Sequence, residues 1–487
     1  MEDKDKVIIK MHKELLPSEK KERKLKTTIN FLVIILSFSI LLVIFLTFRL
    51  GSFLNDDSSL FGDNKIDTIK DYIKSEWLYG NDYEDLDNTL NTKMYYGMTT
   101  FDEDPYTSYM DASEMSDFSN SINKIQLGIG VSYYHGYNTY PLVREVFKDS
   151  GAYNAGIKKG DYIVAVDGVD VKDAEDETIR SLVVGDESTY VSITVLRDGQ
   201  TLDFKCERKE FDSTAYAKLV GDTVVLTLAS FGSNTADTMD NELSQFSDYH
   251  KLIIDERNNS GGYQDALLEI AGLFLEDGTD VMKEIDKDGN SKTFVASYPH
   301  KYYNFDNIII LTNEYTASAA EVFAICMKEM HSNCVLAGNT TFGKGVVQSN
   351  FVLKDGSYLK LTSSYWTSPN GVSLKEGGIE PDIELEHDDV YYLYNYEFEE
   401  GQTFEYDSVS TFVSNAQTIL KFLGYPVNRC DGYFDNSFIA VLNKFKLDKG
   451  LESDGILDYG TYRTILDAYN TSDIDVQLEK AIELINK

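Results

Sequence analysis

The sequence predicts a multidomain α/β protein with a β-rich module, a small all-α C-terminal domain and one apolar segment near the N-terminus. From residue 215 onward, strand-like and helix-like segments alternate, which is typical of an α/β layer with a largely parallel sheet. Between residues 127 and 208, short strands separated by Gly and Asp turns predominate instead. A chain of 487 residues is long enough for about three domains.

The apolar segment is "INFLVIILSFSILLVIFLTF", Ile29 to Phe48, which holds 20 residues without a charge. As a helix it is about 30 Å long, the thickness of a bilayer's hydrocarbon core. The basic stretch "KKERKLK" before it places the N-terminus in the cytoplasm by the positive-inside rule. A cleaved signal peptide is the alternative, although its apolar region is usually shorter and ends in small residues. We expect a cytoplasmic tail (1–28), a transmembrane helix (29–48) and an extracellular remainder.

Composition excludes several classes of function. A formal net charge of −36 repels polyanions, so we expect no nucleic-acid partner. The six histidines form no H-E-x-x-H motif and the four cysteines no C-x-x-C pair, so we expect no metal and no cofactor. Whether Cys326 and Cys334 pair is open, with buried free thiols as the alternative.

The elements are predicted in order along the chain. After a linker, "NKIDTIKDYIKSEWLY" and "LDNTLNTKMYYGMTTF" have helical apolar spacing, and "DEDPYTSYM" interrupts with a turn. The β-rich module contains the strands "LGIGVSYY", "YPLVREVF", "DYIVAVDG" and "YVSITVLRDGQTLDFKC", with helical pieces at "DSGAYNAGIKKGD" and "DETIRSLVVG". The α/β part contains strands at "DTVVLTLASF", "HKLIIDER", "NIIILTN", "NCVLAGN" and "GVVQSNFVL", and helices at "TADTMDNELSQF", "GYQDALLEIAGLFL" and "SAAEVFAICMKEM".

The C-terminal part repeats a short pattern. "DGYFDNSFIAVL" and "DGILDYGTYRTIL" both place D-G-x-x-D before a helix with periodic apolar residues. Asp435 and Asp458 are placed to accept hydrogen bonds from the free N–H groups of those helices. A compact helical domain is therefore expected after a Tyr- and Glu-rich linker.

Three segments carry candidate chemistry, and the first contains Ser318. It follows a buried strand in "TNEYTASAAEVF" and begins an apolar helix, where free N–H groups and the helix dipole stabilise negative charge. The alternative is a serine that only caps the helix.

The second segment, "GNTTFGKGVVQ", contains Lys344 between two glycines. It is one residue from a phosphate-binding loop, but Gly345 replaces the required hydroxyl and a strand rather than a helix follows. A buried lysine can act as a general base, and serine with lysine is a recognised nucleophile–base pair. Gln348 is expected on the same side of the strand, where it would hold the amine. The alternative is a solvated hairpin lysine.

The third segment is "DERNNSGGYQDAL". Gly261 and Gly262 follow a buried strand and lead into a helix, so their backbone N–H groups are candidates for an oxyanion hole. The alternative is a plain turn.

Taken together, "DERNNSGGY", "YTASAAEVF", "AGNTTFGKGVVQ" and "YWTSPNGVSLKEGGIEPDI" resemble the motifs of the carboxyl-terminal processing (tail-specific) proteases, in order and at typical spacing. The resemblance spans residues 66 to 386 and implies a ClpP/crotonase-like α/β protease core. It implies Ser318 as nucleophile, Lys344 as base and Gln348 as the residue that positions the lysine. It also implies an oxyanion hole from the Gly261/Gly262 turn and the Ala319 N–H. Ser260 departs from the family's proline.

Two flanking regions have resemblances of their own. "QLGIGV" and "SGAYNAGIKKGDYIVAVDG" resemble a PDZ domain, which implies that Gly128, Ile129 and Gly130 bind a peptide's terminal carboxylate. The C-terminal segment is similar to a peptidoglycan-binding domain, although Lys446 replaces the usual glutamine.

The sequence therefore predicts a membrane-anchored extracellular serine endopeptidase with a Ser–Lys dyad. Its partners would be proteins with accessible C-terminal tails and peptidoglycan, and homo-oligomerisation is open. The alternatives are a catalytically silent PDZ and wall-binding scaffold, or a peptidoglycan hydrolase. Beyond the N-terminal segments, the expected parts are a linker with helices (49–111), a PDZ domain (112–208), a protease core (209–390), a linker (391–408), a peptidoglycan-binding domain (409–470) and a tail (471–487).

Overall fold

The computed structural model describes residues 21, 25, 63–172, 174–298, 302–374, 377–393 and 398–487. Among these residues, no helix is both long enough and apolar enough to cross a bilayer. The predicted transmembrane helix, 29–48, lies outside the described residues. The chain divides into two compact units, Met1–Met98 and Thr99–Lys487.

The first unit contains the two helices that the sequence predicts. They are α2 (Asp63–Glu76) and α3 (Leu86–Met98), with a short 3-10 turn η2 (Gly80–Asp82) between them. Lys70 donates a hydrogen bond across the pair to Asn91.

The second unit is built on a six-stranded sheet in the order β10-β11-β12-β15-β16-β19. All neighbouring strands are parallel except β10, an antiparallel edge strand. This confirms the largely parallel sheet that the alternating pattern predicts. The strands are β10 (Ala215–Val220), β11 (Thr223–Leu228), β12 (Lys251–Asp255), β15 (Asn307–Thr312), β16 (Cys334–Gly338) and β19 (Ile383–Glu384).

Both faces of this sheet are buried. Even-numbered strand residues such as Leu226 and Ile254 pack against α7 (Thr235–Leu243), α8 (Gln264–Gly272) and α9 (Ala319–Met330). Odd-numbered residues such as Val225 and Ile253 belong to a second core with Ala481 and Ile485. Strand geometry produces this alternation, because successive side chains point to opposite faces.

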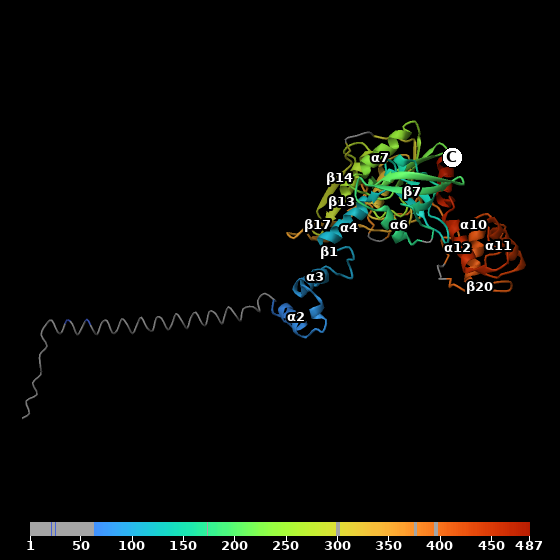
Figure 1. The fold of residues 1–487 in the computed structure, drawn as a ribbon. Coiled ribbons are helices and arrows are strands. Elements are labelled where there is room, and N and C mark those ends of the chain that lie inside the picture. The colour runs from blue at the N-terminus through green and yellow to red at the C-terminus, as the bar shows by residue number, and fades with distance from the viewer. Residues whose placement is uncertain are drawn as a thin grey trace, which may run out of the picture. The chain divides into compact units, whose positions relative to one another are not determined.

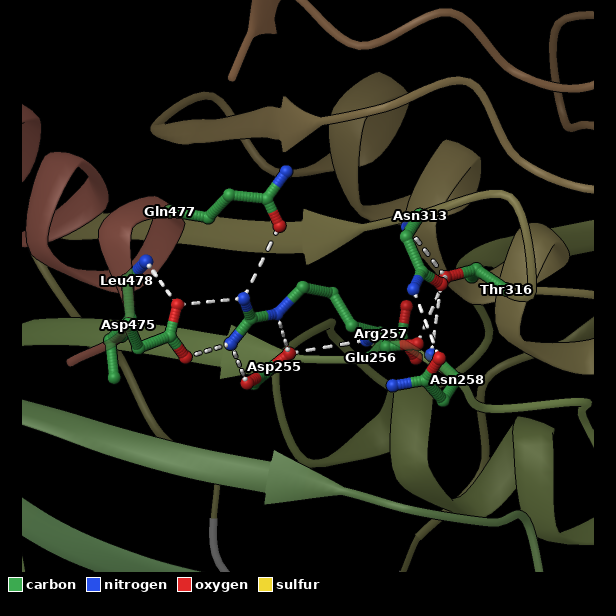
Figure 2. Close-up of polar contacts among 9 residues, drawn as sticks. All are labelled: Asp255, Glu256, Arg257, Asn258, Asn313, Thr316, Asp475, Gln477 and Leu478. Carbon is green, nitrogen blue, oxygen red and sulfur yellow. Dashed lines mark hydrogen bonds and ion pairs between the residues drawn. The ribbon is translucent and has the colours of Figure 1, made fainter. Parts of the chain in front are cut away.

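The helix that covers the second face is α13 (Val476–Ile485), and it corrects the prediction that 471–487 is a tail. Figure 2 shows how the helix is held: the Arg257 guanidinium extends from the end of β12 and lies between Asp255 and Asp475. Arg257 also donates to Gln477 at 3.3 Å. The apolar spacing of Leu478, Ala481, Ile482 and Ile485 suits a helix, and each buried Leu or Ile contributes about 1.5–3 kcal/mol.

A second sheet lies in the same unit, with β1-β18-β13-β14 in order and β17 also paired to β18. The β17–β18 pairing has an irregular register between Val347 and Gln348. Sequence analysis expected β17 only. The strands are β1 (Ser108–Met110), β13 (Asp280–Asp286), β14 (Ser291–Val295), β17 (Val346–Val352) and β18 (Tyr358–Thr367).

The β-rich module has a sheet in the order β3-β4-β5-β7-β8, with β6 paired to β5. The run "LGIGVSYY", expected as one strand, is two: β2 (Ile125–Gly128) pairs with β9, and β3 (Val131–Tyr134) begins the sheet. Gly130 separates them with φ 75°, and a Cβ there would lie 2.1 Å from the Ser150 Cβ. The other elements are α4 (Ala112–Asn123), β4 (Leu142–Val146), α5 (Gly151–Ala155), β5 (Tyr162–Val166), β6 (Val169–Asp170), α6 (Asp176–Val183), β7 (Tyr190–Arg197), β8 (Gln200–Glu207) and β9 (Lys209–Asp212).

The C-terminal domain consists of three helices with a small strand pair, β20 (Thr403–Phe404) and β21 (Leu457–Asp458) (Figure 1). Both predicted caps are confirmed: Asp435 accepts from the Phe438 N–H and Asp458 from the Thr461 N–H, each at 2.8 Å. Lys446 is buried and donates to Asp454 and the Ile456 carbonyl. The helices are α10 (Thr411–Phe422), α11 (Asn436–Asp448) and α12 (Tyr459–Asn470).

The four cysteines are free thiols in this structure, and Cys326 and Cys334 are both buried. Burial raises the pKa of the Cys326 thiol to about 12. These thiols therefore pack as small apolar side chains.

Candidate functional site

Ser318 lies at the tight turn between β15 and α9. It is the residue before the first turn of α9, with φ 59° and ψ −120°, a conformation that costs energy for a residue with a Cβ. The surrounding loop fixes this conformation through the Ala317 N–H, which donates to the Asn259 carbonyl at 2.9 Å. Thr316 donates to the Glu256 carbonyl at 2.9 Å (Figure 2). The serine is thus held at the carboxyl end of a central strand by contacts from the neighbouring strand's loop.

Glu321 joins the Ser318 turn to the Lys344 segment. Its carboxylate is fully buried and accepts hydrogen bonds from the Ser318 N–H at 2.8 Å and the Lys344 N–H at 2.9 Å. It also accepts from the Thr341 hydroxyl at 2.6 Å and the Gly343 N–H at 2.7 Å. Each of the two carboxylate oxygens accepts two hydrogen bonds, so the buried group is fully paired. These bonds fix the distance between the Ser318 turn and the Lys344 segment. The sequence around Glu321 does not show that Thr341, Gly343 and Lys344, which lie about 20 residues further along the chain, are its partners.

Lys344 belongs to a backbone segment that packs closely on its neighbours. Gly343 has φ 92°, and a Cβ there would lie 2.9 Å from the backbone of Gly377. The Lys344 carbonyl accepts a hydrogen bond from the Trp366 indole at 2.8 Å. Gly343 is therefore required because a larger residue would collide with the backbone of Gly377.

The environment of the Lys344 amine makes its charged form less favourable than that of a lysine in water. Burial and, to a smaller extent, the charge of Lys360 together lower its pKa to about 8, while the charge of Glu321 opposes both. The Nζ lies 4.8 Å from the centre of the Tyr106 ring. Among the residues that the structure describes, no hydrogen bond links this amine to Ser318 or to another acceptor.

Gln348 lies near Lys344 but donates elsewhere. Its amide contacts the Thr362 hydroxyl at 3.5 Å, and Thr362 in turn donates to Asp104 at 2.9 Å. In this structure Gln348 is thus linked to Asp104 through Thr362, and its role in holding the lysine amine stays a prediction.

Asp104 and Tyr106 are site residues that sequence analysis missed, because "DEDPYTSYM" was interpreted as a turn alone. The Asp104 carboxylate accepts from the Tyr106 N–H at 3.1 Å and the Thr107 N–H at 3.2 Å, which fixes that turn. The position of the Tyr106 ring beside the Lys344 amine depends on the pairing of β1 with β18, and no local pattern indicates that pairing.

The Gly261–Gly262 turn lies directly against the Ser318 turn. A Cβ on Gly261 would be 2.8 Å from the Ala319 nitrogen. The Gly261 N–H donates to the Asn259 side chain at 2.9 Å, so it is already engaged. Of the three N–H groups predicted to form the oxyanion hole, those of Gly262 and Ala319 therefore remain as candidates. In the described part of the chain, neither group has a hydrogen-bond acceptor.

One cavity of about 740 Å³ brings the predicted residues together. It is lined by the candidate nucleophile, base, glutamine and oxyanion residues: Ser318, Lys344, Gln348, Gly261, Gly262 and Ala319. These residues come from four separate loops and strands, so the fold provides the convergence that the sequence could only suggest. Within the described residues, no group of three or more His, Cys, Asp or Glu side chains could hold a metal ion.

The predicted peptide-binding residues lie elsewhere: Gly128 ends β2, and Ile129 and Gly130 lie between β2 and β3. The Ile129 carbonyl accepts from Ala152 at 2.8 Å and the Gly130 carbonyl from Phe147 at 3.0 Å. The strand that follows, β3, is at the edge of its sheet in the described residues.

Comparison with known proteins identifies three regions of the chain. Residues 222–385 match the model of peptidase family S41, residues 126–208 match a PDZ domain, and residues 410–465 match the model described as a peptidoglycan binding domain.

Several relatives match over most of their length. The chain is 31% identical over 447 residues to the carboxy-terminal processing protease CtpA of Bacillus subtilis (strain 168), covering 90% of this chain and 94% of CtpA. It is 30% identical over 417 residues to CtpB of the same organism, covering 83% and 85%. Among solved structures it is similar to the photosystem II D1 C-terminal processing protease, at 24% identity and a TM-score of 0.37, covering 65% and 85%. The match to CtpA over nearly its whole length shows that the chain belongs to the carboxyl-terminal processing proteases of peptidase family S41 and is a serine-type peptidase with a PDZ domain and a peptidoglycan-binding domain.

Proposed function

We propose that the protein is an endopeptidase in which Ser318 and Lys344 form the catalytic dyad. The neutral Lys344 amine takes the proton of the Ser318 hydroxyl while its oxygen attacks the scissile carbonyl. The N–H groups of Gly262 and Ala319 hold the developing oxyanion. The lysine ammonium then gives its proton to the leaving amine, and water releases the acyl group with Lys344 again acting as base.

The observation that carries this proposal is the Glu321 carboxylate, which binds the backbone N–H of both Ser318 and Lys344. A nucleophile and a base that move independently would lose the alignment that proton transfer needs. The lowered pKa of Lys344, about 8, supports the same assignment. With that pKa about a tenth of the amine is neutral at pH 7, against well under a thousandth at the ordinary value of 10.5.

The test compares wild type, Ser318→Ala and Lys344→Met on an unstructured protein substrate. We expect both variants to lose activity by about a thousandfold or more, because each removes a member of a unit. In wild type, kcat/KM should rise with pH and level off above about 8, where the lysine is neutral.

Lys354→Met is the matched control, since Lys354 is exposed on the turn between β17 and β18. It should leave cleavage unchanged. If Ser318→Ala cleaves as fast as wild type, the dyad is wrong, whereas a wild type that cleaves nothing would favour the silent scaffold.

We also propose that the PDZ domain captures substrate C-termini. The peptide would add as a strand beside β3, with its carboxylate on the N–H groups of the Gly128–Ile129–Gly130 loop. Gly130 supports this, because its positive φ turns the backbone between β2 and β3. The full chain should bind a peptide with a free C-terminus more tightly than the same peptide with a C-terminal amide.

Finally, we propose that the 29–48 run anchors the enzyme in the cell membrane with the catalytic part outside, near peptidoglycan. The run is long enough to span and its basic flank faces the cytoplasm. The protein should sediment with membranes, and protease added to intact cells freed of their wall should remove all but its N-terminal end. A mature N-terminus beyond residue 48 would instead support a cleaved signal peptide.

A further inference from the structure

Basic residues outnumber acidic ones in the lining of the catalytic cavity, whereas acidic residues outnumber basic ones in the whole chain. The chain has 81 acidic and 45 basic residues. Of the residues that line the cavity, Lys124, Lys344 and Lys360 are basic, and Asp265 and Glu269 are acidic. The Lys344 amine is assigned to catalysis, so the role of the second half-buried lysine, Lys360, has to be explained.

Lys360 is on β18 and its amine is held over an aromatic ring. The Nζ lies 4.8 Å from the centre of the Phe118 ring of α4, another residue of the cavity wall. Burial lowers the pKa of the Lys360 amine, and the charge of Asp104 opposes this effect. Within the described residues, no carboxylate lies within 4.0 Å of the amine and no oxygen accepts a hydrogen bond from it.

A half-buried ammonium group without a protein acceptor is less stable than one whose environment is completed by an anionic partner. Asp104 does not do so, because its carboxylate is engaged by Tyr106, Thr107 and Thr362. The ring of Phe118 offers only a weak attraction. The missing partner is therefore an anion that enters the cavity, and a peptide carries one kind of anion, the carboxylate.

We propose that Lys360 binds a carboxylate of the bound substrate and thereby selects which peptides are cleaved. This inference rests on the proposed peptidase site. The carboxylate is either an Asp or Glu side chain close to the scissile bond or the substrate's own terminal carboxylate. Lys360 is thus a specificity-determining residue with no part in the covalent chemistry.

Matched peptide pairs test the proposal. One pair differs by Glu against Gln, placed in turn at each position flanking the cleavage site. The other differs by a free C-terminus against a C-terminal amide. The measured quantity is the ratio of kcat/KM for the charged and the neutral member, because any change in Lys344 affects both members equally and cancels.

We expect wild type to prefer the charged member of one pair by about tenfold, the typical effect of a hydrogen bond to a charged group. Lys360→Met should remove this preference and Lys360→Arg should restore part of it. Lys354→Met, which removes an exposed lysine of the same hairpin, should keep it. A preference contributed by the PDZ domain persists in Lys360→Met and is distinguished in this way.

An unchanged ratio in Lys360→Met for both pairs would overturn the proposal. So would a lower melting temperature for Lys360→Met with the ratio retained, which indicates a structural lysine. Failure of the peptidase assignment shows separately, as cleavage by Ser318→Ala. If no peptide is cleaved, the affinities of the same pairs for Ser318→Ala and for Ser318→Ala with Lys360→Met give the ratio directly.

Discussion

Glu321 and Glu256 are both fully buried in the α/β core, yet their surroundings are opposite. Glu321 accepts four hydrogen bonds from the Ser318 and Lys344 regions. Within the described residues, neither carboxyl oxygen of Glu256 has a partner. Burial raises the pKa of the Glu256 carboxyl well above its ordinary value, and the charge of Asp255 adds to this. The Glu321 carboxylate therefore links two segments of the site, whereas the Glu256 carboxyl lowers the stability of the fold.

The comparison shows that burial alone does not identify a functional acid. What distinguishes Glu321 is the number of backbone donors from separate loops that converge on it. Glu256 contributes to the site through its backbone, since its carbonyl accepts from the Thr316 hydroxyl (Figure 2). The same carbonyl accepts from the Asn259 N–H.

Glu321→Gln should have the largest effect of the changes that test this contrast. The amide replaces one acceptor oxygen by a donor, which leaves two of the four donors facing an NH₂ group. We expect the free energy of unfolding to fall by about 3 kcal/mol. We also expect kcat to fall by at least tenfold, because Ser318 and Lys344 lose a common support. Chemical denaturation and peptide cleavage measure the two effects.

If Glu321→Gln retained both wild-type stability and wild-type kcat, the four hydrogen bonds would not be what joins the serine to the lysine. Glu329→Gln is a suitable control on the same helix. Glu329 accepts from Ser368 and Asn370, away from the cavity lining, so its loss should reduce stability without changing kcat in the folded enzyme.

Glu256→Leu should have the opposite effect on stability and a smaller one. Removing a buried carboxyl without partners should raise the free energy of unfolding by about 1–3 kcal/mol at pH 7. The folded protein keeps this proton at pH values where the unfolded chain has lost it, so wild-type stability falls as pH rises above about 4.5. The gain in Glu256→Leu should therefore grow with pH over that window. A gain that is the same at pH 4 and pH 7 would indicate that Glu256 is ionised in the fold.

Lys360→Met should have the smallest effect on activity. It applies the comparison of buried charged groups to two lysines, Lys344 and Lys360. The charge of Lys360 lowers the pKa of Lys344, so its removal should raise that pKa. The rise of kcat/KM with pH should then move to higher pH, by less than about one unit because the pair is partly exposed to solvent. Lys354→Met should leave the pH profile in place. A shift to lower pH would mean that the two amines do not interact as like charges.

Much of the fold follows from local patterns. Local patterns predict the parallel sheet, the helices that flank it and the caps at Asp435 and Asp458. They do so because the spacing of apolar residues and the turn residues indicate the same element at each of these places. Small residues around Ser318 and Lys344 make these two residues candidates, and the resemblance to the protease family implies their roles as nucleophile and base.

The remainder depends on contacts between distant segments. Tyr106 lies over Lys344 because β1 joins the second sheet, and nothing near Tyr106 in the sequence indicates this. The spacing of Leu478 and Ile482 does indicate a helix. The surface that this helix covers is formed by strands that are distant in sequence, so only the folded sheet shows it. Gly261 was assigned to the oxyanion hole because a sequence does not show that Asn259 already binds its N–H.

The position of α13 has a consequence for the order in which the protein is made. Its apolar residues cover one face of the central sheet, and Asp475 pairs with Arg257 beside them. A chain released after residue 470 would contain the serine, the lysine and every strand of the sheet, but would leave Val225, Ile253 and Ile309 without this cover. An uncovered apolar sheet face favours aggregation during biosynthesis. The protease core is therefore completed only after the peptidoglycan-binding domain has been synthesised, and a chain that stops before α13 is expected to aggregate instead of cleaving.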